Sequence, residues 1–117
     1  MLQGIGIDII ETRRFQTLED KDAFLTTVFT KKEIEHGRNE HDPDMHWAVL
    51  FTCKEAILKA LALGLSCGSF WHDIVLEPAH TVSVTGHVET LLTPERTINL
   101  THAHSRKYAI SCALINT

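Results

Sequence analysis

The stretch from residue 44 to residue 63 constrains the fold more than any other part of the chain. It predicts one long helix, with Gly64 as its stop signal, and apolar side chains occupy nearly every direction around the helix axis. The exception is a narrow polar stripe in which Glu55 and Lys59 lie one turn apart, with Thr52 beside them. Because a helix that is apolar on most sides is normally buried, we expect other elements to surround this one.

The first residues of the chain predict a strand. In LQGIGIDII, residues 2–10, isoleucines alternate with Gly4, Gly6 and Asp8, which is the period-two pattern of a β-strand. Glycines in a strand leave room for the close approach of another backbone or of a ligand. Asp8 shares a face with these glycines, so we expect it where a polar group can come near.

The remaining segments predict the α+β class. Helical spacing covers residues 13–35, where Thr30 and Glu33 form a capping box for a short second helix, and residues 37–44 form a loop. Four alternating runs follow the long helix: DIVLE (73–77), TVSVTG (81–86), TINLTH (97–102) and KYAISCALIN (107–116). They predict a meander that the N-terminal strand joins, and hence a mostly antiparallel sheet beside a long buried helix.

Composition predicts one domain, residues 1–117, in a reducing compartment such as the cytoplasm. Hydrophobic residues make up 44% and charged residues 22% of the chain, which is ordinary for a compact domain. A net charge of −4 disfavours nucleic acid as a partner, and the charges inside the longest apolar region disfavour a membrane span. The three cysteines have no paired spacing, which favours free thiols.

Two interpretations of the polar stripe are open. In the first, Glu55 and Lys59 form an ion pair at a partly exposed edge, contributing about 0.3–0.5 kcal/mol. In the second, the stripe faces a ligand, so that a carboxylate holds a hard cation and lysines hold the anion bound to it. Asp8 favours the second, because Mg²⁺ takes one or two protein carboxylates and completes its shell with water and phosphate oxygens.

Histidines and basic pairs allow further interpretations. His102 and His104 would share a strand face, so a zinc pair is geometrically possible, but scattered surface or interface histidines are the more ordinary reading. Arg13 and Arg14 are adjacent, as are the two lysines at 31–32. Each pair is either solvated helix surface or a small patch for an acidic partner.

Three motifs resemble those of the holo-acyl-carrier-protein synthases, the small 4′-phosphopantetheinyl transferases. GIGIDIIETRRF at residues 4–15 is similar to the family's G-x-G-x-D-I-x-E segment, and FTCKEAILKA at residues 51–60 to its F-x-x-K-E-A-x-x-K-A helix. INLTHAH and KYAISCALI are similar to its closing strands, in which a Ser/Thr-His pair precedes a Tyr-Ala strand. The resemblance covers essentially the whole chain and implies the 4′-phosphopantetheinyl transferase fold.

The resemblance implies an enzyme that uses coenzyme A and Mg²⁺. In that reaction a serine hydroxyl of an acyl carrier protein attacks the β-phosphate of coenzyme A. The phosphopantetheine arm moves to the serine, and adenosine 3′,5′-bisphosphate leaves. The carrier protein would be of the fatty-acid or the polyketide type.

The resemblance also implies roles for five residues. Asp8 and Glu55 would be the Mg²⁺ ligands, and Lys59 would contact the coenzyme A phosphates. Lys54 would assist in binding the coenzyme or support the helix. His102 would lie near the coenzyme or the attacking serine, where it could help take up the serine proton; a carboxylate or a metal-bound water is an equally good base.

The family also implies partners. Arg14, with Arg13 beside it, matches a basic position that meets the acidic carrier protein, and the family is typically a homotrimer with each active site between neighbouring subunits.

The chain departs from the family at three places. Leu50 stands where arginine is usual, residues 61–64 read LALG instead of F-G-T-G, and no G-K-P is recognisable in residues 76–86. These regions help the family hold the coenzyme. A second candidate is therefore a catalytically impaired relative that binds a carrier protein or coenzyme A.

Overall fold

The computed structural model describes residues 1–63, 70–77 and 81–117. The elements follow in the order β1 (Leu2–Glu11), the 3₁₀ helix η1 (Thr12–Phe15), α1 (Lys21–Val28), α2 (Lys31–Arg38), α3 (Pro43–Ala60), β2 (Ile74–Leu76), β3 (Val82–Val84), α4 (Gly86–Leu91), β4 (Thr97–His104) and β5 (Tyr108–Asn116). The α+β class and the long central helix are thus confirmed. Among the described residues, no helix is both long enough and apolar enough to cross a membrane.

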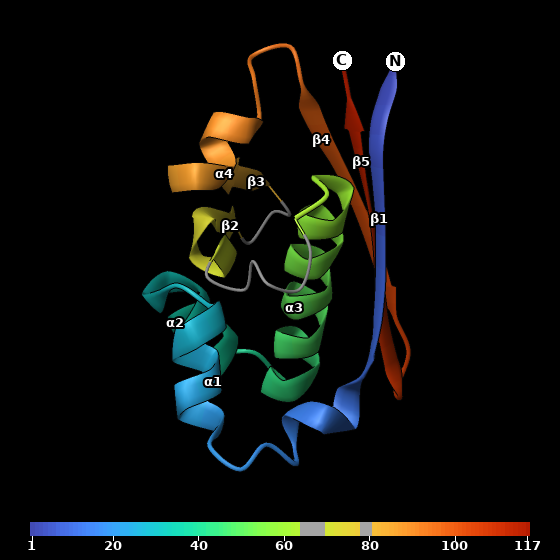
Figure 1. Cartoon of the computed structure of the whole chain (residues 1–117). Coiled ribbons are helices and arrows are strands. Elements are labelled where there is room, and N and C mark those ends of the chain that lie inside the picture. Colours follow the sequence, from blue (N-terminus) through green and yellow to red (C-terminus); the bar gives the residue numbers. More distant parts are fainter. Residues whose placement is uncertain (64–69, 78–80) are drawn as a thin grey trace.

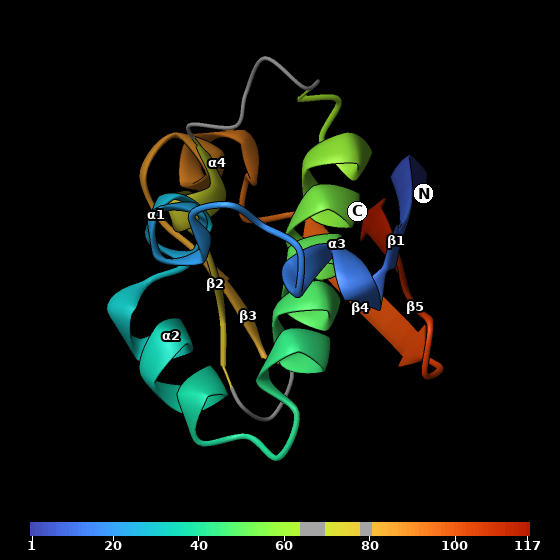
Figure 2. The ribbon, with the colours of Figure 1, turned by 90° about the horizontal axis from the view of Figure 1, so that it is seen from below.

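Helix α3 is the centre of the molecule. The antiparallel sheet β1-β5-β4 covers one side of it, and α1, α2, α4 and the β2–β3 hairpin lie on the other (Figures 1 and 2). Nine of its residues are buried, Lys54 and Thr52 included. The expected enclosure of this helix is confirmed, because apolar clusters pack against it from both layers.

Strand β1 packs directly on α3 through its glycines. A Cβ atom at Gly6 would overlap the carbonyl oxygen of Ala56, and one at Gly4 would overlap that of Ala60. The glycine face of the strand therefore turns inward, as the close-approach argument predicts. The isoleucine face turns outward, and Ile7 is 55% exposed.

The helix ends differ slightly from the sequence-based bounds. Asp42 caps α3, since its side chain accepts a hydrogen bond from the Met45 amide, and the helix ends at Ala60 rather than near residue 63. Ala62, with φ of 59°, takes the left-handed position that closes the helix, and the Leu63 amide donates to the Leu58 carbonyl. The predicted stop, Gly64, lies outside the described residues.

The helical stretch predicted for residues 13–35 is divided into η1, α1 and α2. The capping box at its second break is confirmed: the Thr30 side chain accepts from the Glu33 amide, and the Glu33 carboxylate accepts from the Thr30 amide. The N-cap needs an extended backbone at Thr30, which separates α1 from α2. The loop predicted from residue 37 begins after Arg38.

The expectation of a single meander is wrong. Strands β2 and β3 pair only with each other, whereas β4, β5 and β1 form the larger sheet. Helix α4 separates the two sheets along the chain, with Val88 fully buried. Its amide donates to the Asp73 carboxylate, which fixes the start of α4 beside β2. The apolar positions 88, 91 and 92 have helical spacing, which the strand-centred interpretation overlooked.

Candidate active site

The candidate metal ligand Asp8 lies at the seam between β1 and α3. The Lys59 ammonium donates to Asp8 Oδ1 over 2.9 Å and to the carbonyl oxygen of Ile7 over 3.0 Å. The Asp8 side chain is 15% exposed and that of Lys59 is 46% exposed. A helix residue and a strand residue that are distant in sequence therefore meet at a solvent-facing ion pair.

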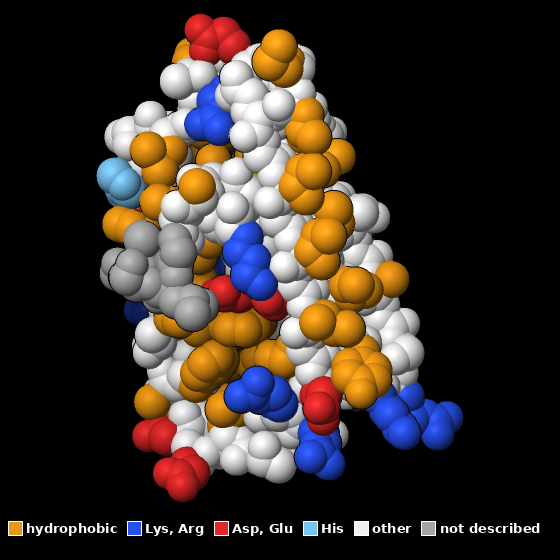
Figure 3. Space-filling view, turned by 45° about the vertical axis from the view of Figure 1, so that its right-hand side comes forward, with side chains coloured by type: hydrophobic (Ala, Val, Ile, Leu, Met, Phe, Trp, Pro, Cys, Tyr) orange, Lys and Arg blue, Asp and Glu red, His pale blue; other side chains and the backbone are white. Residues whose placement is uncertain are grey.

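Glu55 stands one turn before Lys59 on the same flank of α3. Its Oε1 accepts a hydrogen bond from the indole Nε1 of Trp71 over 2.7 Å. Trp71 belongs to the segment between α3 and β2 and was not among the residues that the motifs indicated. In Figure 3, acidic side chains lie directly beneath a basic one near the middle of this face. We call Asp8, Glu55 and Lys59 the seam site.

The seam site fits a hard divalent cation. Within the described ranges, no group of three or more His, Cys, Asp or Glu side chains could hold a metal ion. Mg²⁺ does not require such a group, because it binds through one or two carboxylates and takes its other ligands from water and phosphate. Asp8 and Glu55 offer two carboxylates, and Lys59 offers a cation for an accompanying anion.

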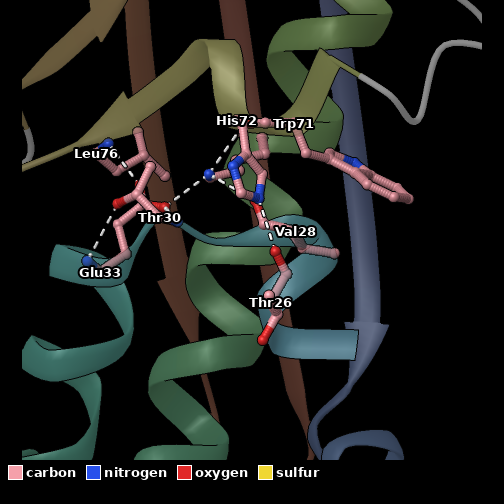
Figure 4. Close-up of polar contacts among 8 residues, drawn as sticks. Thr26, Val28, Thr30, Glu33, Trp71, His72 and Leu76 are labelled. Atoms are coloured by element: carbon pink, nitrogen blue, oxygen red, sulfur yellow. Dashed lines mark hydrogen bonds and ion pairs between the residues drawn. The ribbon is translucent and has the colours of Figure 1, made fainter. Parts of the chain in front are cut away.

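Lys54 points about 100° around the axis of α3 from Glu55 and is completely buried. Its ammonium donates to Glu33 Oε1 over 2.7 Å and to the carbonyl oxygens of Val28 and Trp71, each over 3.0 Å. Figure 4 shows this network between α1, α2 and the segment that leads to β2. Burial lowers the pKa of Lys54 below its usual value, and the Glu33 carboxylate opposes that shift. All three ammonium hydrogens are used, which supports the helix-supporting role expected of Lys54.

His102 lies in the same cross-strand row as Asp8. Both residues pair with Ser111 of the central strand, one from each side. Two strand spacings separate them, about 10 Å. Thr52 of α3 lies over the middle of the row, since its hydroxyl is 2.7 Å from that of Ser111. The helix therefore passes between Asp8 and His102.

His102 lines a pocket on the far flank of α3. The pocket has a volume of about 550 Å³ and is bounded by α2, α3, β2 and β4. Leu50, where the family usually has arginine, is in its wall. Carboxylates of Glu35, Glu40 and Glu77 also line it. The structure therefore joins Asp8 to Lys59, with Glu55 one helical turn from Lys59, and places His102 on the other flank of α3 within one chain.

Two histidines of this pocket share a carboxylate. His36 Nε2 is 3.1 Å and His46 Nδ1 is 3.9 Å from Glu40 Oε1. Burial lowers the pKa of His46, Glu40 opposes the shift, and His36 adds to it. His102 lines the same pocket, but no group of three His, Cys, Asp or Glu side chains in the described part of the chain could hold a metal ion, so the zinc pair considered from the sequence gains no third ligand here.

The basic pair Arg13–Arg14 lies on η1, directly after β1. Thr12 ties η1 to the β4–β5 hairpin, because its amide donates to the Lys107 carbonyl and its hydroxyl to the Arg106 carbonyl. Arg13, Arg14, Arg106 and Lys107 are all exposed, and we call this group the basic end of the molecule. Arg13 also pairs with Glu11 over 3.2 Å. The hairpin cations were missed because only the tertiary fold brings residues 106–107 beside residues 12–14.

The departures from the family pattern can be placed in part. Ala62 occupies the second position of LALG, where the family has glycine, and its positive φ is the conformation that favours glycine. Gly64 and residues 78–80 of the segment lacking G-K-P lie outside the described residues.

Comparisons with known proteins agree in sequence and in fold. The family model for the 4′-phosphopantetheinyl transferase superfamily matches residues 4–113. The holo-[acyl-carrier-protein] synthase of Thermoanaerobacter sp. (strain X514) is 35% identical over 94% of this chain and 84% of its own length. That of Protochlamydia amoebophila (strain UWE25) is 39% identical over 89% of this chain and 91% of its own length.

Solved structures share the fold. The holo-[acyl-carrier-protein] synthase of Neisseria meningitidis superposes with a TM-score of 0.84 at 21% identity, covering 100% of both chains. That of Bacillus anthracis str. Ames, determined in complex with CoA (3′,5′-ADP), superposes with a TM-score of 0.77 at 24% identity and covers 98% of this chain and 96% of its own.

Proposed function

The chain belongs to the 4′-phosphopantetheinyl transferase superfamily, and on that premise we propose that it transfers 4′-phosphopantetheine from coenzyme A to a serine of an apo acyl carrier protein in a Mg²⁺-dependent reaction. Adenosine 3′,5′-bisphosphate is the other product. The observation that carries this proposal is the seam site, where Lys59 joins Asp8 one helical turn from Glu55. Two carboxylates and an ammonium at one seam suit a metal-bound pyrophosphate.

In the proposed reaction the serine oxygen forms a bond to the β-phosphorus, and the bond from that phosphorus to the bridging oxygen breaks. Asp8 and Glu55 would hold Mg²⁺, which when bound supplies charge neutralisation at the pyrophosphate. Lys59 would balance the negative charge that develops on the phosphoryl oxygens. The leaving oxygen keeps the electron pair, and the serine proton passes to a base. His102, a carboxylate and bound water are candidates for that base.

We further propose that the active unit is a homotrimer in which one subunit's His102 pocket completes the seam site of the next. Within one chain α3 lies between the two, and a subunit interface would allow the His102 pocket of one copy to face the seam site of another. The outer face of β1 and β5 provides an interface, since Ile5, Ile7 and Ile9 are 53–59% exposed. Figure 3 shows apolar side chains in a line down this sheet.

Mixing two inactive variants tests the shared site. Lys59→Met and His102→Ala should each lose transfer, and mixed trimers, formed by unfolding and refolding the two together, should recover part of it. Sedimentation should give a trimer for the wild type and a smaller species for Ile7→Glu. No recovery in mixed trimers would show that His102 does not act across the interface.

The basic end is the proposed docking surface for the acidic carrier protein. Arg13 and Arg14 follow β1 within a few residues of Asp8, and residues 106–107 enlarge the patch. Because these side chains are exposed, their attraction for an acidic partner is long-range and salt-sensitive.

For the localisation we propose a reducing compartment such as the cytoplasm, as the cysteine content predicts. Cys53 and Cys112, the described cysteines, are both free.

The transferase itself is tested by mass spectrometry. The protein is incubated with an apo carrier protein, coenzyme A and Mg²⁺, and the carrier should gain the mass of one phosphopantetheine. A carrier whose acceptor serine is replaced by alanine is the matched control, and Glu55→Ala enzyme should give no product. The absence of a mass gain across fatty-acid and polyketide carriers would contradict the proposal.

One observation favours the second candidate, a catalytically impaired binding module. The His102 pocket has Leu50 and four glutamates in its wall, and among the residues that the structure describes only one of these, Glu33, is paired with a lysine, Lys54, which weakens the pocket's attraction for an anionic coenzyme. Binding of a carrier protein or of coenzyme A without transfer would identify this candidate.

A further inference from the structure

Trp71 connects the seam site with the buried network of Lys54. Its indole Nε1 donates to Glu55 Oε1 over 2.7 Å, and its backbone carbonyl accepts from the Lys54 ammonium over 3.0 Å. Trp71 therefore contacts Lys54 through its backbone carbonyl and Glu55 through its side chain. Figure 4 shows its indole pointing away from Glu33.

The backbone around Trp71 is held at two points. Lys54, which is 0% exposed, fixes the Trp71 carbonyl, and Glu33 Oε2 accepts from the Leu76 amide over 2.9 Å. The same glutamate bonds to Lys54, so both points belong to one network. The indole ring also lies against Phe51, with the ring centroids 6.1 Å apart. The position of the indole N–H is therefore set before any ligand binds.

A glutamate on a helix has a flexible side chain, and a metal ligand must present its oxygens in one direction. A hydrogen bond to one carboxylate oxygen restricts the rotamer and leaves the second oxygen outside that bond. Such partners of metal ligands typically contribute about 10–100-fold in metal affinity or activity.

We propose that Trp71 is a positioning residue that orients the Glu55 carboxylate for the divalent cation, and that the Lys54–Glu33 network holds Trp71 in place for this role. The inference rests on the proposed function for the identity of the metal site. It separates two contributions of one residue, because the carbonyl serves the fold and the indole N–H serves Glu55.

Trp71→Phe tests the inference by removing the N–H while keeping the backbone carbonyl and an aromatic ring. Trp47→Phe is the matched control, since Trp47 is buried against Phe29 in the core. Mn²⁺ serves as the probe and is titrated in the presence of coenzyme A, with free Mn²⁺ measured by electron paramagnetic resonance. We expect Trp71→Phe to weaken Mn²⁺ binding about 10–100-fold. Trp47→Phe should bind as the wild type does.

A second measurement does not depend on the folding of the Trp71 variant. The chain has two tryptophans, so Trp47→Phe leaves Trp71 as the only indole emitter. Paramagnetic Mn²⁺ should quench the fluorescence of Trp71 with the same dissociation constant that electron paramagnetic resonance gives. Glu55→Ala should abolish the quenching.

The outcomes separate the inference from the proposed function. If the wild type does not bind Mn²⁺, or binds it as tightly as Glu55→Ala does, the metal site is wrong and the inference falls with it. If Glu55→Ala loses binding while a folded Trp71→Phe keeps wild-type affinity, the metal site stands and the role of Trp71 is overturned. Unquenched Trp71 emission at saturating Mn²⁺ would also overturn it.

Discussion

The two lysines of the KEAILK sequence form ion pairs of nearly the same length in opposite surroundings. Lys54 lies 2.7 Å from Glu33, and both side chains are almost wholly buried. Lys59 lies 2.9 Å from Asp8, but its side chain is 46% exposed. Five residues along one helix thus separate a pair enclosed in protein from a pair that faces solvent.

The difference shows that the distance of an ion pair does not reveal its role. Buried charges cost several kcal/mol each to desolvate, and only a full set of partners offsets that cost, which Lys54 has. An exposed pair contributes about 1 kcal/mol or less, and its groups can exchange partners with a ligand. The first arrangement suits positioning of the chain, and the second suits binding.

The largest expected effect follows from Lys54→Met. Removing the ammonium leaves the Glu33 carboxylate buried without its cation, which should lower the free energy of unfolding by about 3–5 kcal/mol. Denaturant unfolding followed by circular dichroism measures the loss. Adding Glu33→Gln should recover part of it, because the amide removes the uncompensated charge. A loss below about 1 kcal/mol would contradict this prediction, because it would show that the Lys54–Glu33 pair contributes no more than an exposed ion pair does.

Lys59→Met should have the opposite effect: a large loss of transfer activity and a small loss of stability. Transfer should fall about 100–1,000-fold, because a cation that stabilises developing charge is lost. The free energy of unfolding should change by about 1 kcal/mol or less. Turnover and unfolding measured on the same preparation test both statements. A variant that is unstable but retains wild-type turnover would reverse the roles assigned to the two lysines.

Charge reversal tests whether the carrier protein approaches from the side of the seam site. Arg14→Glu should raise the KM for the carrier about three- to tenfold at low salt, and less at high salt because exposed charges are screened. Lys31→Glu is the matched control, an equal charge change at an exposed position on α2. Equal effects from both variants would indicate a response to net charge rather than to docking at η1.

The smallest expected effect is a pH dependence of the free energy of unfolding that arises from His46 of α3. Burial lowers the pKa of His46 below the usual 6.5 in the folded chain, so the unfolded chain takes up a proton first as the pH falls. Relative to His46→Gln, the wild type should keep its stability above about pH 6.5 and lose about 1 kcal/mol or less below it. Unfolding curves at several pH values measure this difference. A relative gain on acidification would contradict the sign.

Much of the fold could be predicted because its signals are local. The capping box of Thr30 and Glu33, the alternation in β1 and the apolar circumference of α3 each depend on neighbours within a few residues. The meander was predicted wrongly because pairing partners are not local, and the short α4 was overlooked between two strands.

The candidate site divides in the same way. Helical periodicity placed Glu55 and Lys59 on one flank, and the glycines of β1 marked the strand that packs there. Trp71 carries no motif, and its indole reaches Glu55 only because the chain returns to α3 before β2. The separation of His102 from the seam site depends on where α3 crosses the sheet.

By itself, the sequence determined which residues share a strand or helix face, because backbone periodicity and capping act over a few residues. It also carried the motifs that indicate the family. Only the tertiary structure decided that Lys54 is enclosed and Lys59 is open, and that Trp71 joins them. Burial and long-range contacts arise when distant segments pack together, and spacing along the chain does not encode that packing directly.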